Sequence, residues 1–379
     1  MKGHLKKRSK DSWTIVVDLG LKANGKRNQK WKSHKGTKKE AEALLARMLT
    51  ELEDGVFIDA KKTSVSEYLD KWIASIKGSV SATTYERYKQ LCDKHLKPTI
   101  GNIALNKLQA IKISEMYSNA IVSGRLDKSG GLSKQTVLHM HRVLKRALSQ
   151  AVKWGLISKN PCDAVDNIPK PDKKERLTFT TKETLNLLEL LNGKPLYLPV
   201  LLAVTTGMRR GEILGIRWKD IDLDNNRLNI RQIVIETREY GLEIKQPKTD
   251  SSSRSIALPQ ITIEALNKYR VEQAKLRLQL GKGMTPEVML FDELSGLNVP
   301  GNLTSRFRKF IKTRKLKDVT FHDLRHTHAT HLLEQNIHPK IVSERLGHST
   351  IALTMNTYSH VMPTMQEEAA NKVDDILSI

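Results

Sequence analysis

The sequence predicts a multidomain protein that is mainly α-helical, with small β elements at its start and in its second half. Its 379 residues exceed the usual size of one compact domain. Apolar residues recur at helical spacing through most of residues 64–165. Residues 167–176, NIPKPDKKER, combine two prolines with a run of charges and no apolar period, which is typical of a linker. We therefore expect domains at residues 1–60, 61–166 and 177–379, the last with a C-terminal tail.

A small module of strands and one helix is predicted for residues 1–60. The segment WTIVVDLGL reads as a strand, KANGKRNQ supplies an Asn-Gly turn, and QKWKSHKG is the expected returning strand. A capping box of Thr37 and Glu40 begins the helix, and Gly55 ends it. One face of the first strand is expected to carry Trp13, Ile15, Val17 and Leu19.

This module is strongly basic. Residues 1–39 contain thirteen Lys and Arg but two Asp and Glu. Such charges can form a solvated surface, but we favour binding to DNA phosphates because the whole chain is basic. The residues expected to contact DNA here are Lys6, Lys7, Arg8, Lys26, Arg27, Lys30 and Lys32.

Four helices are predicted in residues 64–165. A capping box of Ser64 and Glu67 begins the first, and Pro98 and Gly101 stop the second. The third and fourth helices are expected within residues 107–124 and 132–157.

The fourth of these helices has an apolar stripe and a basic remainder. The stripe consists of Val137, Leu144, Ala147, Leu148 and Ala151. The basic residues suit an ordinary helix surface, but the net charge of the chain favours a side that faces DNA. They are Lys134, His141, Arg142, Lys145 and Arg146.

Helices are also expected at residues 181–193 and 196–220 of the second half. Three strand-like stretches follow them, at residues 227–236, 242–247 and 253–259. The rest of the chain is predicted to be mostly helical.

The charge of the chain limits the classes of partner. The sequence has 64 Lys and Arg against 41 Asp and Glu, a formal net charge of +23. This charge suits nucleic acid, an anionic membrane surface or solubility alone. Without a long apolar span or a lipid-anchor motif, double-stranded DNA is favoured and no membrane partner is expected. Two cysteines fit a reducing cytoplasm, and no glycine-rich phosphate loop indicates a nucleotide cofactor.

Two stretches in the second half place cations near turns. Residues 205–218, TTGMRRGEILGIRW, hold Arg209 and Glu212 one helical turn apart. Residues 245–256, KQPKTDSSSRSI, place Lys248 between two strand-like stretches, where a long cation can reach outward. Each stretch alone is a weak indication, because an Arg-Arg pair usually belongs to an ordinary surface.

Two later stretches add histidines and a tyrosine. FHDLRHTHATHLL, residues 321–333, has His322 and Arg325 three residues apart and therefore adjacent on a helix. LGHSTIALTMNTYSH contains His348 and, ten residues later, Tyr358. A single tyrosine after a helix usually contributes to packing.

Together and in this order, the four stretches resemble the tyrosine recombinase (phage integrase) family. The motif of that family is an Arg in a T-G-x-R turn, a hairpin Lys, H-x-x-R, a His in L-G-H and a Tyr nine or ten residues later. All six positions are filled, by Arg209, Lys248, His322, Arg325, His348 and Tyr358. The layout resembles integrases of temperate phages and conjugative transposons. It implies an arm-type DNA-binding domain of β-sheet and helix at 1–60, a helical core-binding domain at 61–166 and a mixed α/β catalytic domain at 177–379.

The resemblance implies a role for each position. Tyr358 would attack the scissile phosphate and form a 3′-phosphotyrosyl link, while Lys248 protonates the leaving 5′-oxygen. Arg209, Arg325 and His348 would stabilise the transition state, His322 would assist as a base and Glu212 would orient the cluster. These residue types fit the reaction, because guanidinium groups match the oxygens of a pentacoordinate phosphorus and preorganised cations stabilise its charge.

The histidine-rich stretch has a competing interpretation as a metal site. His326, His328 and His331 lie close to His322, but Arg325 would repel a cation there, and no thiolate or obvious carboxylate completes a ligand shell. We therefore expect no metal and no cofactor, and we assign His326, His328 and His331 to helix packing or polar contacts on the DNA side.

A site-specific recombinase that integrates and excises a mobile element is the favoured function. The alternatives are a regulatory DNA-binding protein without catalysis, against which the complete set of six argues, and a DNA-relaxing enzyme of the type IB topoisomerase class. The resemblance implies core-type and arm-type DNA sites, a homotetramer in the synapse, an excisionase and a host DNA-bending protein as partners, and action in the bacterial cytoplasm at the nucleoid.

Overall fold

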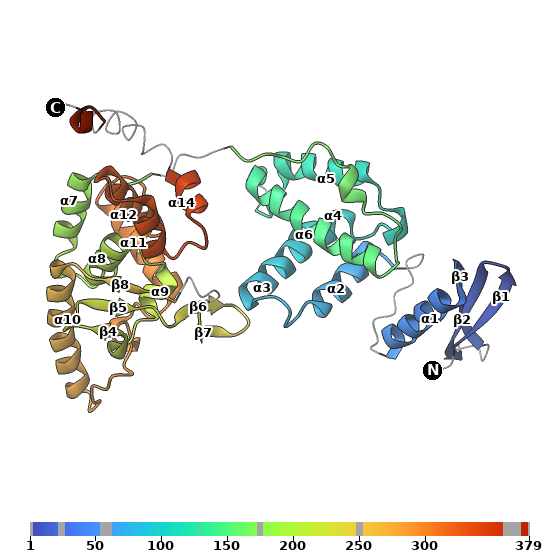
Figure 1. Ribbon diagram of the computed structural model, residues 1–379, viewed down its shortest axis with the longest axis horizontal. Helices are drawn as coiled ribbons and strands as arrows, with labels where there is room; N and C mark the ends of the chain where they lie inside the picture. The colour runs from blue at the N-terminus through green and yellow to red at the C-terminus, as the bar shows by residue number, and fades with distance from the viewer. Residues whose placement is uncertain are drawn as a thin grey trace. The chain divides into compact units, whose positions relative to one another are not determined.

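The computed structural model describes residues 3–21, 27–53, 63–127, 129–172, 177–247, 253–358 and 373–377, without the side chains of residues 19–21, 27, 28, 30, 47 and 50–53. The chain divides into two compact units, residues 1–173 and 174–379 (Figure 1). This division falls within the segment predicted as a linker, and the limits of the three domains stay predictions. None of the helices among the described residues is long and apolar enough to cross a membrane.

The N-terminal module is an antiparallel sheet covered by one helix. Its strands pair in the order β1-β2-β3, and Ile15, Val17 and Met48 form its core. The capping box is confirmed, since the Thr37 amide donates to Glu40 Oε2 at 3.0 Å and the Glu40 amide donates to Thr37 Oγ1 at 3.3 Å. The elements are β1 (Gly3–Ser9), β2 (Ser12–Leu21), β3 (Arg27–Lys35) and α1 (Lys38–Glu53).

Strand β1 was not predicted from the sequence. Leu5 is the single large apolar residue of its stretch GHLKKRS, so the strand has no apolar alternation, and its pairing with β2 defines it. The Asn-Gly turn and Gly55 lie outside the described residues.

The helical part of the first unit packs around Tyr68, Trp72, Tyr117 and Leu144, all of which are buried. The second capping box is confirmed, because the Ser64 amide donates to Glu67 Oε2 at 2.8 Å and the Glu67 amide to Ser64 Oγ at 3.2 Å. The main helices are α2 (Val65–Ser75), α3 (Ala82–Leu91), α4 (Lys97–Ile100), α5 (Ala110–Ser123) and α6 (Lys134–Lys153).

Pro98 does not stop the second predicted helix, which corrects that prediction. A π-helical turn, Cys92–Leu96, follows α3 and continues into α4. Pro98 lies in the first turn of α4, where a missing N–H group is tolerated. The helix ends at Gly101, as predicted.

The prediction that His141 faces DNA is wrong. Its side chain is buried, and its Nδ1 lies 3.1 Å from the hydroxyl of Tyr117 on α5. His141 lies four residues after Val137 and three before Leu144, so the helix carries it into the apolar stripe. Burial lowers its pKa.

The second unit combines helices with two small antiparallel sheets (Figure 1). Its helices are α7 (Thr181–Leu191), α8 (Tyr197–Thr206), α9 (Arg210–Leu214), α10 (Gln260–Gln279), α11 (Pro300–Thr313), α12 (Asp323–Glu334), α13 (Pro339–Leu346) and α14 (Ile351–Tyr358). Its strands are β4 (Ile221–Asp222), β5 (Arg227–Asn229), β6 (Ile233–Thr237), β7 (Gly241–Lys245) and β8 (Ser255–Ala257).

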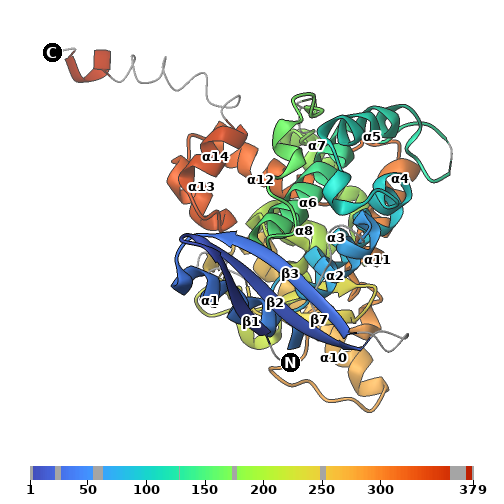
Figure 2. The same ribbon diagram turned by 90° about the vertical axis from the view of Figure 1, so that its right-hand side faces the viewer.

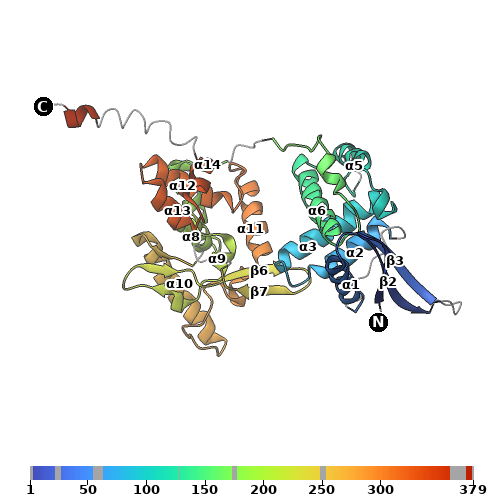
Figure 3. The ribbon, with the colours of Figure 1, turned by 45° about the vertical axis from the view of Figure 1, so that its right-hand side comes forward.

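Two predicted elements of this unit are divided in the structure. The helix expected at 196–220 is interrupted at Gly207, whose φ of 67° ends α8. The strand expected at 227–236 forms β5, which pairs with β4 and β8, and β6, which pairs with β7. The β6–β7 hairpin extends away from the body of the unit (Figure 3). Helix α8 contacts both α10 and α12, while α12, α13 and α14 lie side by side (Figure 2).

Candidate active site

The turn after α8 brings two helices together. A Cβ at Gly207 would lie 2.6 Å from Cδ2 of His328 and 2.7 Å from Cδ2 of Leu346, so only glycine fits at this left-handed position. The Gly207 carbonyl accepts a hydrogen bond from Nη1 of Arg325 at 2.7 Å. The predicted T-G-x-R turn therefore holds Arg325 in place from a distant part of the sequence.

Arg209 and Glu212 form a closed pair at the start of α9. Glu212 accepts from the Arg209 amide through Oε2 and from Arg209 Nη1 through Oε1, each at 2.8 Å. Nη2 of Arg209 donates to the Gly347 carbonyl at 3.4 Å. The Glu212 side chain is 3% exposed and that of Arg209 is 41% exposed, so the carboxylate orients a guanidinium that still faces solvent.

Arg254 completes this arrangement and was missed in the sequence. Its Nη2 and Nη1 donate to Oε2 and Oε1 of Glu212 at 3.0 and 3.3 Å, and its Nε donates to the Arg345 carbonyl at 2.6 Å. The side chain is 8% exposed. Arg254 thus joins the segment before β8 to α9 and to the end of α13, next to the L-G-H motif. No local pattern distinguishes it from the other arginines of the chain.

This cluster carries a net positive charge. Burial tends to raise the pKa of Glu212, but Arg254 and Arg209 lower it below its usual range, so the carboxylate is ionised. Burial and then repulsion by Arg209 lower the pKa of Arg325 to about 9, which leaves it charged at neutral pH. Three guanidinium groups therefore surround one carboxylate, and an anion would be attracted.

The two terminal nitrogens of Arg325 differ in their surroundings. Its side chain is buried, and Nη2 has no hydrogen-bond partner within the described ranges of the chain. A buried donor left unpaired costs about 1–3 kcal/mol. A phosphate oxygen would provide the missing acceptor.

Tyr358 ends α14 and is 2% exposed, packed with Leu333, Val342 and Leu346. Its hydroxyl lies 2.6 Å from Nδ1 of His326, and it interacts electrostatically with Arg325. Tyr358 is therefore held beside the arginine cluster by a histidine to which the sequence assigned only packing or polar contacts.

The remaining predicted histidines differ in their surroundings. His348 follows Gly347 directly, and its Nδ1 lies 2.8 Å from Oγ1 of Thr354 on α14. His322 precedes α12, is exposed, and has its ring 5.2 Å from that of His326 in an edge-on orientation. Lys248 lies outside the described residues.

His328 and His331 agree with the packing interpretation. The Val204 carbonyl accepts from Nδ1 of His328, and the Phe179 carbonyl accepts from Nε2 of His331, each at 2.9 Å. Burial, followed by the charge of Arg345, lowers the pKa of His328 to about 3, so it is neutral. Across the residues that the structure describes, no three His, Cys, Asp or Glu side chains are grouped as metal ligands.

Some of the residues expected to contact DNA in the N-terminal module are exposed or partly exposed, and the structure does not describe the side chains of the others. Lys6 and Lys7 of β1 place their ammonium groups 4.9 and 5.8 Å from the ring centres of Trp31 and Trp13. Arg8 is exposed and Lys32 is partly exposed. The structure does not describe Lys26 or the side chains of Arg27 and Lys30.

On α6, two of the expected DNA-contacting residues have acidic partners. Lys134 lies 2.9 Å from Asp172 and Lys145 lies 2.8 Å from Asp163, while Arg142 is exposed. Exposed ion pairs of this kind are weak, so a phosphate can compete for both lysines.

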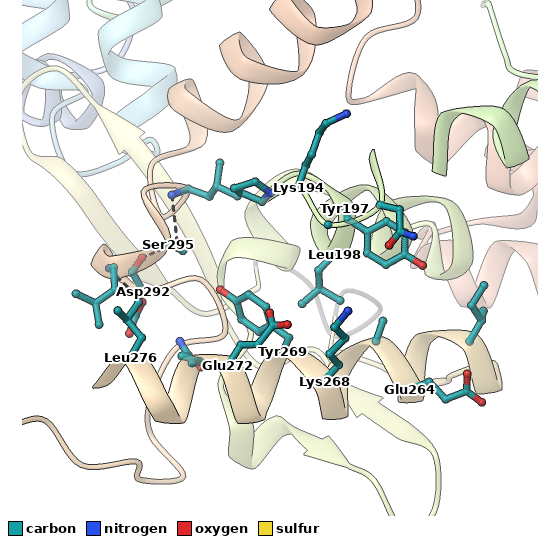
Figure 4. A pocket seen from close by; sticks show the side chains of 18 residues that line it. Lys194, Tyr197, Leu198, Glu264, Lys268, Tyr269, Glu272, Leu276, Asp292 and Ser295 are labelled. Carbon is teal, nitrogen blue, oxygen red and sulfur yellow. Dashed lines mark hydrogen bonds between the residues drawn. The ribbon is translucent and has the colours of Figure 1, made fainter. Parts of the chain in front are cut away.

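A pocket of about 540 Å³ lies beside α10 (Figure 4). Leu198, Tyr269 and Asp292 are among the residues that line it, and the five predicted positions that the structure describes are not. The pocket is separate from the arginine cluster and takes no part in the site.

Comparisons with known proteins place the chain among the phage integrases. The sequence model described as "Phage integrase family" matches residues 178–365, and the one described as "Phage integrase, N-terminal SAM-like domain" matches residues 64–121. The chain is 28% identical to a tyrosine recombinase XerC-like protein of Caldanaerobacter subterraneus subsp. tengcongensis, over 98% of this chain and 97% of that protein. It is 24% identical to the ICEBs1 integrase of Bacillus subtilis, over 90% and 91%.

Two solved structures share the fold. The integrase of transposon Tn1549, in complex with a circular intermediate DNA, is 22% identical, with a TM-score of 0.66 over 82% of this chain and all of that chain. A lambda integrase tetramer bound to a Holliday junction is 19% identical, with a TM-score of 0.53 over 91% of this chain and 95% of that chain.

Proposed function

The chain belongs to the phage integrase family, and from this membership and the geometry of the site we propose that Tyr358 is the nucleophile of a site-specific DNA recombinase. Tyr358 attacks the scissile phosphate, which gives a 3′-phosphotyrosyl link and a free 5′-hydroxyl. Rejoining to a second DNA strand integrates or excises a mobile element. Because the phosphotyrosine conserves the energy of the broken bond, joining requires neither ATP nor a metal.

The buried guanidinium of Arg325, held by the Gly207 carbonyl, supports this proposal most directly. Attack on the phosphate builds negative charge on its non-bridging oxygens. A preorganised guanidinium whose Nη2 has no partner among the described residues can donate hydrogen bonds to these oxygens. Arg209, held by Glu212, supplies a second fork. His348 contributes a further donor, and Lys248 protonates the leaving 5′-oxygen.

The partners proposed for this protein follow from its family. Its substrate is double-stranded DNA with core-type and arm-type sites, and four copies act together in the synapse. An excisionase and a host DNA-bending protein direct the reaction, and the reaction takes place at the bacterial nucleoid, where the DNA is. The lambda integrase tetramer on a Holliday junction supports the assembly of four.

Covalent trapping tests the proposal. The protein is incubated with a nicked suicide duplex from the junction of the element, in the presence of EDTA, and resolved on a denaturing gel. We expect a denaturant-resistant adduct on the 3′ side of the break. Binding without an adduct on any junction DNA would favour the regulatory DNA-binding alternative. An adduct with relaxation of supercoiled DNA but without recombination between two sites would favour the topoisomerase alternative.

The affinity for DNA is expected to fall steeply as salt rises. Each phosphate contact contributes a slope of about −0.9 to the plot of log affinity against log salt concentration. If the basic residues of the first unit contact DNA, replacing both Lys6 and Lys7 with Gln should make the slope less steep by nearly two such contacts. Replacing Lys315 and Lys317 of the second unit with Gln removes the same charge elsewhere and serves as the comparison. A slope near zero for the unaltered protein would contradict this prediction.

A further inference from the structure

The hydroxyl of Tyr358 is in direct contact with a base. Tyr358 ends α14 and His326 lies in the first half of α12, yet Oη and Nδ1 are 2.6 Å apart. The two side chains are 2% and 6% exposed, so water is largely excluded from the contact. We propose that His326 accepts the proton of Tyr358 during attack on the phosphate. This inference rests on the proposed function, in which Tyr358 is the nucleophile.

The ordinary protonation states of the two groups set the direction of this hydrogen bond. A tyrosine hydroxyl is protonated at neutral pH and a neutral histidine has one ring nitrogen free to accept. The hydroxyl therefore donates to Nδ1, and the ring hydrogen of His326 is on Nε2. A general base must lie within about 2.6–3.2 Å of the proton donor, and this contact satisfies that requirement before DNA is bound.

Helix α12 carries His326 and also Arg325, a cation that acts on the nucleophile. Arg325 is the preceding residue, fixed through its bond to the Gly207 carbonyl, and it interacts electrostatically with Tyr358. Arg325 therefore favours the phenolate character of the nucleophile while His326 removes the proton. The negative charge of the phosphorane would in turn stabilise the imidazolium formed on His326.

His322 lies beside this base on the solvent side. Its ring is 5.2 Å from that of His326, at 88°, and its side chain is exposed. Within the proposal, His322 assists His326 and gives the pair access to water, whereas the direct contact with the nucleophile belongs to His326.

The step balances without any further reactant. The bond from Tyr358 Oη to phosphorus forms, the bond from phosphorus to O5′ breaks, and the hydroxyl proton moves to Nδ1 of His326. The leaving O5′ takes a proton from Lys248, the proposed acid. In rejoining, a 5′-hydroxyl attacks the phosphotyrosine and gives its proton to the neutral amine of Lys248, while Nδ1 of His326 returns its proton to the departing phenolate oxygen.

Single-turnover cleavage of two substrates tests this role. His326→Asn can keep a hydrogen bond to Tyr358 but cannot take up its proton. We expect it to cleave at least about 10²-fold more slowly, the usual loss when a general base is removed. The loss should also appear on a 5′-bridging phosphorothiolate duplex, because a thiolate leaves without an acid but does not help to deprotonate Tyr358. Lys248→Ala, in contrast, should recover on the phosphorothiolate.

Two further variants separate catalysis from structure. His326→Ala should regain at least about tenfold in rate with added imidazole, since the small base can enter the vacated space. His331→Asn, on the same helix but bonded to the Phe179 carbonyl, should cleave within about threefold of the unaltered protein. Thermal unfolding and DNA binding show whether each variant is folded.

A different set of results would overturn the proposal. If His326→Asn, once folded, cleaves at the unaltered rate or faster, the contact only holds Tyr358 in a resting position. If His326→Asn instead recovered its cleavage rate on the phosphorothiolate, His326 would act on the leaving O5′ and not on Tyr358. Absence of an adduct with the unaltered protein on both substrates would instead refute the proposed function.

Discussion

Replacing Tyr358 with phenylalanine is expected to abolish the covalent adduct with DNA, a loss of at least about four orders of magnitude in cleavage rate. The ring remains, so its packing with Leu333 and Leu346 is kept. The lost hydroxyl is the atom that would attack phosphorus, and neither Arg325 nor His326 can replace it as a stable oxygen nucleophile. The measurement is the fraction of suicide duplex trapped on a denaturing gel.

The same substitution should also lower stability to a modest extent. It leaves Nδ1 of His326 without its partner in a buried position, which costs about 1–3 kcal/mol in the free energy of unfolding. Tyr117→Phe is a matched control, because Tyr117 is also buried and bonds to Nδ1 of His141 at 3.1 Å in the first unit. It should lose similar stability and cleave normally. An adduct that persists in Tyr358→Phe would mean that another residue is the nucleophile.

Local sequence patterns predicted local structure well. The capping boxes at Thr37 and Ser64 are confirmed because their hydrogen bonds join residues only three apart. Two other predictions were wrong: that Pro98 stops a helix, and that one helix spans residues 196–220. Apolar spacing shows neither that Pro98 lies in the first turn of α4, where its missing N–H group is tolerated, nor that Gly207 adopts the left-handed conformation that ends α8.

The residues of the site also fall into two groups: those that sequence motifs predict, and those whose partners are distant in the sequence. Motif order alone singled out Arg209, Arg325 and Tyr358, and in the structure Arg209 and Tyr358 each interact electrostatically with Arg325. Arg254 and His326 could not be found in this way. Their partners, Glu212 and Tyr358, are 42 and 32 residues distant in sequence, and the folded chain alone brings them into contact.

Loss of Arg254 is expected to damage both the fold and the reaction. Arg254→Met leaves Glu212, which is 3% exposed, with Arg209 as its remaining partner among the described residues. Removing one member of a buried ion pair typically costs about 3–5 kcal/mol in the free energy of unfolding. Because Glu212 also orients Arg209, and Arg254 bonds to the Arg345 carbonyl near His348, cleavage by the folded fraction should slow by about 10²-fold.

A matched pair elsewhere in the same unit separates these two effects. Arg217 bonds to Asp220 at 2.9 and 3.1 Å, and the Asp220 side chain is 2% exposed, so Arg217→Met breaks a similar contact outside the site. We expect it to lower stability in urea unfolding but to leave cleavage by the folded protein unchanged. Equal slowing by both variants would show that Arg254 acts only through stability.

The double variant Glu212→Gln with Arg254→Met tests whether the charge of Glu212 positions Arg209. Removing the carboxylate charge together with Arg254 should restore part of the lost stability, since a buried carboxylate that has lost Arg254 is then no longer present. Cleavage should stay slow, because a glutamine holds the Arg209 guanidinium less firmly than a carboxylate does. Stability that recovers while the rate does not would identify the carboxylate as the group that positions Arg209. Recovery of both would mean that the pair serves folding alone and that Arg209 finds its position from Gly347.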